Sequence, residues 1–459
     1  MISRRAKILY DESLNPFAEP RTSVAFSEQL RDKLKQMGFG GDTEKPVGIE
    51  FDDIVAASFR IRKGVGKTPC EKCSIPELST MEVFFKKENL HPSGSFKERG
   101  AINSLLLLSE LGLFLTEKHF QEHKTKKTPR TSDLRSLMDQ KDRGVITATP
   151  GNHGIALAFH GQALGIPVHV VLPEQSPLIK QTMCKKFGAS IIIKGSNQAE
   201  AKEFATSMAT EKRLAYIEGH DHPHVISGQG TIGLEIIDQV CNVDAVVLPV
   251  GGGGLLAGVA LAVKTVYPDV QIIGVESKRC PSFQTAIDAG HPVTLNIDHP
   301  SALTDALNLP KVGKNAFHIA TGLVDKLVAV SDDHISLAVL KLIENERAVT
   351  EGSGAAGVAA LLGGYLPELH GKRVVVPLCG GNIDPSVLSS CIEKGLALEG
   401  RLVRFTITID EKSGGLAQII TLLASVSARI RDMTQEQILT DNNMFTLKGT
   451  QKSMNNDRM

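Results

Sequence analysis

The sequence predicts an α/β protein with open, twisted parallel sheets, and three observations support this prediction. Short apolar runs rich in β-branched residues recur along the chain, as is typical of strands that are buried on both faces. Helical segments such as 154–165 and 254–267 separate the runs, and this alternation favours parallel strands joined by helical crossovers. Glycine-rich turns follow several runs, at the sheet edge where ligands of α/β proteins gather. The predicted strands cover residues 144–149, 168–173, 189–195, 244–250, 271–276 and 373–379.

The composition indicates a soluble, globular protein with a small-molecule partner. The chain has 459 residues, enough for two or three domains, and 42% of them are hydrophobic. Lysine plus arginine and aspartate plus glutamate both total 51, so the formal net charge is zero. No overall field therefore attracts nucleic acid or a membrane surface, and we expect neither as a partner.

The cysteines predict a reducing compartment and no metal site. Seven cysteines are scattered, and only Cys70 and Cys73 have the C-x-x-C spacing. Structural zinc needs about four ligands, and no second pair completes them. An odd count without a secretory signal favours the cytoplasm, although the basic opening of the chain leaves a mitochondrial address open. No apolar run reaches the ~18 residues that span a bilayer.

Changes of pattern divide the chain into regions. Residues 1–47 are weakly periodic and read as an N-terminal arm, and the α/β pattern occupies 48–400. Within it, 116–142 is polar and basic and reads as a surface insertion. Residues 401–450 read as strand, turn, amphipathic helix and two further strands, which is the β-α-β-β start of a small α+β module. Residues 451–459 form a polar, disordered tail.

Lys97 lies at a junction between a strand-like run and a helical run. The stretch 91–100, HPSGSFKERG, places it after a Ser-Gly-Ser turn and between Phe96 and Glu98. This stretch alone fits two interpretations equally well. Lys97 is either an ordinary residue of a first helical turn or an amine held at a strand end for chemistry.

Four consecutive glycines, Gly251–Gly254, join a predicted buried strand to a helix. Backbone N–H groups at such a helix start can hold a phosphate. A P-loop is excluded because no Gly-Lys-Ser/Thr follows. A dinucleotide site stays open, since Gly252, Gly254 and Ala257 satisfy G-x-G-x-x-A and Glu276 ends the next strand. A purely structural turn also stays open.

Two further turns carry polar groups at strand ends. The turn 149–154, TPGNHG, offers backbone N–H groups for a carboxylate and the Asn152 amide for an oxygen. It also fits a capped turn in which His153 packs. Cys379 ends another strand and is either a weak donor or apolar filler. We expect all these groups at the strand ends of one sheet. A nicotinamide oxidoreductase has no use for Lys97, whereas a pyridoxal phosphate enzyme uses every part.

Four motifs in order, SGSFKERGA, TPGNHG, GGGGLLAG and CGGNID, resemble those of the fold-type II pyridoxal-phosphate enzymes. TPCEKCSIPEL and SGQGTIGLEI add to the resemblance, which covers roughly 48–115 and 143–398. Within the family the chain looks most like threonine dehydratases, the L-threonine ammonia-lyases, with serine dehydratase and serine racemase as near relatives. The resemblance implies two open parallel-sheet domains, the smaller at about 93–205.

The resemblance also implies residue roles. Lys97 would form the Schiff base with the cofactor, pyridoxal 5′-phosphate. Phe96 would pack beside the ring, and Cys379 would face the ring nitrogen. The implied cofactor-binding residues are Phe96, Asn152, Gly251, Gly252, Gly253, Gly254, Glu351 and Cys379. The implied substrate-carboxylate residues are Thr149, Gly151, Asn152 and His153, and no metal ligand is expected.

The implied activity is β-elimination of L-threonine to 2-oxobutanoate and ammonia, with L-serine to pyruvate as a side or alternative reaction. Lys97 would remove the α-proton, and a neutral Cys379 suits elimination. The resemblance places this lyase in amino-acid catabolism or isoleucine biosynthesis, as a homodimer or homotetramer. A serine racemase, or a weakly active cofactor-bound protein that senses amino acids, remains the alternative.

The sequence departs from the family pattern at several positions. Pro150 stands where relatives carry serine or alanine, which argues against racemisation because proline has no hydroxyl or N–H. Ala306 replaces a glycine after Asp305, and Ser282 replaces an acidic metal ligand. The region 401–450 looks like an ACT-like regulatory module whose last helix and strand are missing, with 414–416 as its ligand turn.

Overall fold

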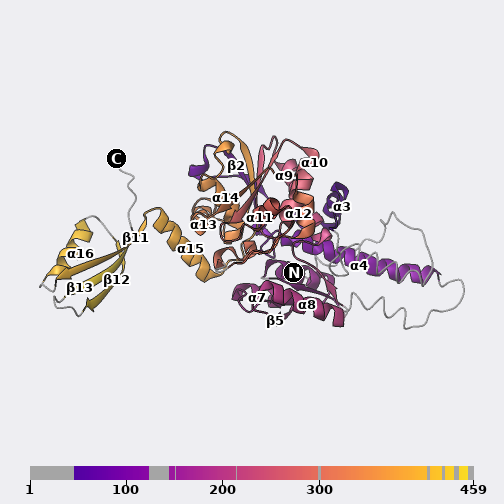
Figure 1. The fold of residues 1–459 in the computed structure, drawn as a ribbon, viewed down its shortest axis with the longest axis horizontal. Helices are drawn as coiled ribbons and strands as arrows, with labels where there is room; N and C mark the ends of the chain where they lie inside the picture. The colour runs from indigo at the N-terminus through magenta and orange to yellow at the C-terminus, as the bar shows by residue number, and fades with distance from the viewer. Residues whose placement is uncertain are drawn as a thin grey trace.

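The computed structural model describes residues 46–122, 144–149, 151–212, 214–297, 301–410, 414–425, 429–438 and 444–452. Within them the chain forms two α/β units and a C-terminal α+β unit (Figure 1). The predicted arm, all but its last two residues, and Pro150 lie outside the described residues. The same holds for 123–142 of the predicted insertion. Its first residues, 116–122, continue helix α4.

The larger unit is built on a six-stranded sheet in which all neighbours are parallel except the first pair. Its strands, in spatial order, are β1 (Cys70–Lys72), β2 (Glu82–Lys86), β10 (Arg373–Pro377), β7 (Ala245–Pro249), β8 (Gln271–Ser277) and β9 (Lys326–Val330). Its helices are α3 (Phe51–Ile61), α9 (Pro223–Gln239), α10 (Gly254–Val266), α11 (Ser282–Ala289), α12 (Lys314–Ala320), α13 (Asp332–Glu346), α14 (Gly352–Leu362) and α15 (Pro385–Leu398). Short 3₁₀ turns occur at η2 (Pro76–Leu78), η3 (Glu88–Leu90), η5 (Ala302–Leu307) and η6 (Pro367–Leu369).

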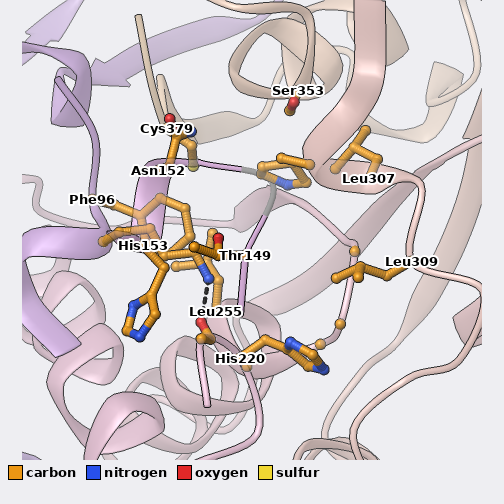
Figure 2. Close-up of a pocket in the computed structure, with 18 of the residues that line it drawn as sticks. Phe96, Thr149, Asn152, His153, His220, Leu255, Leu307, Leu309, Ser353 and Cys379 are labelled. Atoms are coloured by element: carbon orange, nitrogen blue, oxygen red, sulfur yellow. Dashed lines mark hydrogen bonds between the residues drawn. The ribbon is translucent and has the colours of Figure 1, made fainter. Parts of the chain in front are cut away.

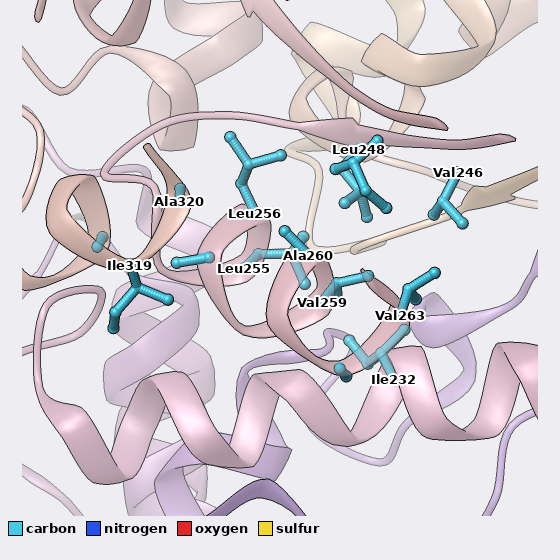
Figure 3. Packing of buried hydrophobic residues seen from close by; sticks show 14 of the residues in the cluster. Ile232, Val246, Leu248, Leu255, Leu256, Val259, Ala260, Val263, Ile319 and Ala320 are labelled. Atoms are coloured by element: carbon cyan, nitrogen blue, oxygen red, sulfur yellow. The ribbon is translucent and has the colours of Figure 1, made fainter. Parts of the chain in front are cut away.

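Helices cover both faces of this sheet, and each strand contributes side chains to the apolar layers on both faces. Side chains of a strand alternate between faces. Val246 and Leu248 of β7 therefore pack with α9, α10 and α12, as Figure 3 shows. Ala245 and Val247 of the same strand pack with α13 and α14 on the other side. Burial on both faces explains why this strand is apolar throughout.

The smaller unit has a four-stranded parallel sheet. Its strands, in spatial order, are β5 (Ser190–Ile193), β4 (Val168–Leu172), β3 (Val145–Ala148) and β6 (Ala215–Tyr216). Its helices are α4 (Lys97–Glu122), α6 (Asn152–Leu164), α7 (Leu178–Lys186) and α8 (Gln198–Lys212). Val145 and Val170 pack with α4 and α6, whereas Ile146 and Val171 pack with α8.

The C-terminal unit follows α15 and has the predicted β-α-β-β order. Its elements are β11 (Leu402–Asp410), α16 (Gly415–Ser425), β12 (Arg429–Ile438) and β13 (Met444–Lys452). The three strands are antiparallel in the order β11-β13-β12. Strand β13 continues through Lys452, so the first two residues of the predicted tail are ordered in a sheet.

The structure confirms all six predicted parallel strands and corrects one expectation. The polar strand ends belong to two sheets rather than one, because β3 is in the smaller sheet and β7 and β10 are in the larger. Hydrophobic pattern marks a strand as buried but does not assign it to a sheet, since every one of these strands is apolar on both faces. Strand β6 was not predicted, because two residues are too few to show the hydrophobic pattern of a strand.

Candidate active site

A pocket lies where strand ends of the two sheets meet (Figure 2). Its lining follows the carboxyl ends of β3 and β6 in the smaller sheet and of β7 and β10 in the larger. It is completed by the start of α4 and by residues of α7, α8 and η5. The polar and glycine residues of the lining are Lys97, Thr149, Asn152, His153, Lys180, Gln198, Glu218, Gly219, His220, Gly251, Gly252, Gly253, Gly254, Glu351, Ser353 and Cys379. Every predicted site residue except Gly151 is in this lining, which also includes Phe96. Their roles remain predictions.

Lys97 is the first residue of α4, and the turn before it is tied to the larger sheet. The N–H of Phe96 donates to the carbonyl of Cys379 at 3.0 Å, and Ser95 pairs with Gly380 in a β-bridge. The ammonium of Lys97 lies 5.1 Å from the centre of the Phe96 ring. Backbone pairing therefore holds the lysine and the thiol in one place.

Buried ion pairs bond the start of α4 to η3 and α9. The Arg99 guanidinium is fully buried and donates to Glu88 at 2.7 Å and to Glu235 at 2.7 Å. These carboxylates belong to η3 and α9, so the helix start is bonded to two other elements. Removing one partner from such a buried pair costs roughly 3–5 kcal/mol, which makes the position of Lys97 rigid. Sequence reasoning missed this network because its members are far apart along the chain.

The Lys97 ammonium donates a hydrogen bond to the carbonyl of Gly219, drawn as the dashed line in Figure 2. Burial lowers the pKa of Lys97 to about 8, against the opposing charges of the Glu218 and Glu351 carboxylates. About a tenth of the amine is therefore unprotonated at pH 7, far more than for an exposed lysine, and only the unprotonated amine attacks a carbonyl or removes a proton.

The four glycines form a cradle at the start of α10. Gly253 has a φ of +90°, a conformation that favours glycine. A Cβ on Gly252 would lie 2.1 Å from Cδ2 of His220, and one on Gly254 would lie 2.0 Å from the His220 carbonyl oxygen. There is thus no room for a side chain at Gly252 or Gly254. The backbone N–H groups at the start of α10, a helix of 13 residues, face the pocket. The cradle fits an anion such as the phosphate of pyridoxal phosphate.

Asn152 belongs to a network that spans both units. Its amide donates to the carboxylate of Glu351, and its carbonyl accepts from Asn382 at 3.1 Å. The Lys180 ammonium lies 2.6 Å from Asp305 and 3.3 Å from Glu351. Sequence analysis missed Lys180, which sits on a short helix without any motif.

The remaining predicted residues are placed as follows. Burial raises the pKa of the Cys379 thiol well above its usual range, so this group is neutral. Burial, with the charge of Lys97, lowers the pKa of His153 to about 3, so its ring is neutral as well. The N–H of Gly151 donates to the Thr149 hydroxyl at 3.1 Å. A Cβ on Gly151 would meet the side chain of Lys180 at 2.2 Å, so Gly151 packs against that lysine.

The structure defines the surroundings of two residues discussed above, Ala306 and Glu276. Ala306 does not have a positive φ, since the described non-glycine residues with one are Asn242 and Arg347. Alanine at this position is therefore free of the strain that a left-handed backbone would impose. Glu276 accepts from the N–H groups of Phe283 at 2.7 Å and Gln284 at 2.9 Å, so it caps α11.

An amine, an aromatic ring, a neutral thiol and an anion cradle together fit pyridoxal phosphate. A family model for pyridoxal-phosphate dependent enzymes matches residues 61–380. The chain is 34% identical to an L-threonine ammonia-lyase of Thermotoga maritima over 383 residues, which is 83% of this chain and 88% of that protein. It is 35% identical over 396 residues to an L-threonine ammonia-lyase of Geobacter sulfurreducens, covering 85% and 89% of the two chains.

Solved structures agree with this assignment. Maize serine racemase superposes with a TM-score of 0.65 at 28% identity, over 77% of this chain and 99% of that one. The processed form of threonine deaminase isoform 2 from Solanum lycopersicum gives a TM-score of 0.62 at 30% identity, over 76% and 95%. By the extent of the family match and of these alignments, the chain belongs to the pyridoxal-phosphate dependent enzymes.

Proposed function

We propose that this protein is an L-threonine ammonia-lyase, which converts L-threonine to 2-oxobutanoate and ammonia and L-serine to pyruvate. The observation that carries the proposal is the position of Lys97. Its amine, with a pKa lowered to about 8, lies in one pocket with the glycine cradle and the turn at Thr149. The curated relatives named above are L-threonine ammonia-lyases, which supports the same reaction.

Each group in the pocket has a task in this reaction. Pyridoxal phosphate, when bound, supplies the electron sink for bond breaking at the substrate α-carbon. Lys97 would hold the cofactor and then accept the α-proton. The N–H groups of Gly251–Gly254 would hold the phosphate. The turn at Thr149 and the backbone of 151–153 would hold the substrate carboxylate, and the neutral Cys379 would face the ring nitrogen.

The test begins with the purified protein reconstituted with pyridoxal phosphate. We expect a visible absorption band that borohydride abolishes, with the reduced adduct found on the peptide that contains Lys97. L-threonine should then give 2-oxobutanoate, and Lys97→Ala should give none. A protein that binds the cofactor at Lys97 but forms no keto acid from threonine or serine would overturn the proposal. A threonine-induced spectral change without turnover would then favour the amino-acid-sensing alternative.

A serine racemase is the second candidate, because maize serine racemase is among the structures that superpose on this chain. Pro150, which argues against racemisation, lies outside the described residues. Chiral chromatography after incubation with L-serine separates the two candidates. Pyruvate without D-serine supports the ammonia-lyase, and D-serine in excess of pyruvate supports the racemase.

We also infer a regulatory role for residues 402–452. Three antiparallel strands in the order β11-β13-β12, with a helix after the first, are consistent with the first part of an ACT-like module. The turn at Gly414, where φ is +94°, would be its amino-acid-binding turn.

A cytoplasmic location and a homo-oligomeric state complete the proposal. Among the described residues, no helix has the length and apolar character to cross a membrane.

A further inference from the structure

The segment after β6, residues 217–222, touches both functional parts of the pocket. The carbonyl of Gly219 accepts the hydrogen bond of Lys97. The next residue, His220, packs its ring against Gly252 and its carbonyl against Gly254. In Figure 2, His220 and His153 flank the bond between Lys97 and Gly219. One short segment therefore links the reactive amine with the phosphate cradle.

Glu218 orients the imidazole of His220. The Nδ1 atom of His220 lies 3.3 Å from Oε1 of Glu218. The same carboxylate accepts from the N–H of Gly219 at 3.0 Å and from the Tyr216 hydroxyl at 3.2 Å, and lies 2.7 Å from the Lys202 ammonium. A carboxylate held this firmly fixes the ring with Nδ1–H facing it, in the manner of a buried acid–imidazole pair.

The other ring nitrogen of His220 is left for a ligand. Within the part of the chain that the structure describes, Nε2 makes no hydrogen bond. The neighbouring ring atom, Cδ2, is the atom that a Cβ on Gly252 would meet at 2.1 Å. Because Nε2 is bonded to Cδ2, it lies beside the cradle. The side chain as a whole is 21% exposed.

We propose that Glu218 and His220 form a proton-holding pair for the phosphate bound by Gly251–Gly254. His220 shares a proton between Nε2 and that phosphate, and Glu218 stabilises the positive charge on the ring. His220 is then the source of the proton that the substrate hydroxyl takes up as it leaves as water. This last step rests on the proposed function.

The protons balance over one turnover. Lys97 gains the α-proton, and the His220–phosphate pair loses one proton to the departing hydroxyl. Lys97 releases its extra proton when it rejoins the cofactor. His220 takes one up from solvent.

The charges around His220 tie its protonation to occupancy of the cradle. Burial lowers the pKa of His220 to about 4. Lys97 on α4 and Lys202 on α8 lower it further, while Glu218 raises it. His153 on α6 also faces the ring and is neutral. The ring is therefore uncharged in the apoenzyme. A bound phosphate dianion favours the charged ring, as does the removal of the Lys97 charge when the cofactor joins it.

The test measures proton uptake and phosphate ionisation, neither of which needs turnover. Calorimetry of pyridoxal phosphate binding to the apoenzyme, in buffers of different ionisation enthalpy, gives the number of protons taken up. Phosphorus NMR of the reconstituted protein follows ionisation of the bound phosphate. Substitution His220→Phe fills the space beside Gly252 without a hydrogen bond, and His220→Gln keeps a donor that carries no charge. The exposed His318 on α12 provides a control, His318→Gln.

We expect the two His220 variants to take up about one proton fewer on binding than the parent, by linkage. Cofactor affinity should fall about tenfold in His220→Phe and less in His220→Gln, because a charge-assisted hydrogen bond is lost. The phosphorus resonance should move toward that of the free dianion in both. Substitution Glu218→Gln should reduce the uptake, and His318→Gln should match the parent.

Unchanged proton uptake and an unchanged phosphorus resonance in both His220 variants would overturn the proposal, and His220 would be a spacer only. If His220→Phe fails to fold, His220→Gln decides alone. If the parent binds the cofactor but makes no keto acid, the proposed function fails while the proton and NMR measurements still judge the pair.

Discussion

At the scale of single residues, the burial of Lys97 sets the pH at which it reacts. Burial lowers its pKa to about 8, whereas an exposed lysine has a pKa near ~10.4. Only the unprotonated amine attacks an aldehyde, so the rate at which apoenzyme captures pyridoxal phosphate should rise with pH and level off above about pH 8. Stopped-flow absorbance measures this rate. A rate that still rises tenfold per pH unit at about pH 9 would show that Lys97 has an ordinary pKa.

The cradle glycines should differ in how well they tolerate a methyl group. In Gly252→Ala the new Cβ meets Cδ2 of His220 at 2.1 Å and Cγ at 2.3 Å, so the ring must shift from its place beside Glu218 but the backbone need not. In Gly254→Ala it meets the His220 carbonyl oxygen at 2.0 Å, which moves only if the backbone moves. We therefore expect the larger loss of cofactor affinity, more than about tenfold, in Gly254→Ala. Fluorescence titration with pyridoxal phosphate measures both.

Gly66→Ala is the matched control for these two variants, because no atom lies within 4 Å of its added Cβ and its φ is not positive. It should bind the cofactor as the parent does. Equal affinities for all three variants would show that the cradle does not hold the phosphate.

At the scale of elements, Lys180 on α7 bonds the smaller unit to η5 and to the start of α14 in the larger. The Lys180 side chain is 3% exposed, and although burial alone lowers its pKa, Glu351 and Asp305 raise it. Substitution Lys180→Met would leave two carboxylates without their cation in a buried place. We expect a loss of about 3 kcal/mol in the free energy of unfolding, measured by denaturant titration of the apoenzyme.

The exposed pair Lys72–Glu82, with side chains 66% and 35% exposed, is the matched control. Lys72→Met should cost less than about 1 kcal/mol, because solvent screens such pairs. If the two variants lost the same stability, the contacts of Lys180 would contribute no more than a surface ion pair.

The positions of these residues along the chain show which parts of the site could be predicted from the sequence. Lys97 and Gly251–Gly254 were predictable because each lies in a contiguous motif at the end of an apolar strand. Lys180, Glu218 and His220 were not. Lys180 pairs with Asp305, 125 positions away, and a pair so distant leaves no local pattern. Glu218 and His220 follow β6, whose two residues are too few for a strand signal.

At the scale of the whole molecule, the C-terminal unit is separable from the pocket. The described clusters of buried apolar side chains draw their members from residues 49–391, before β11 begins. The pocket lining also ends before it, at Cys379. A chain that ends at Gly400 should therefore fold, bind pyridoxal phosphate with the affinity of the parent and keep its basal activity.

What that shortened chain should lose is its response to amino acids. In the parent, an effector bound at the turn near Gly414 would change the threonine concentration needed for half-maximal rate, because it favours one arrangement of the C-terminal unit. Assays with each of the common amino acids as added effector, on both chains, make the comparison. Gly414→Val is the point variant to pair with the deletion, since φ at this position is +94° and a β-branched residue cannot adopt it without strain. An effector that acts equally on the parent, the shortened chain and Gly414→Val must bind within residues 1–400, and the C-terminal sheet would then have a structural role only.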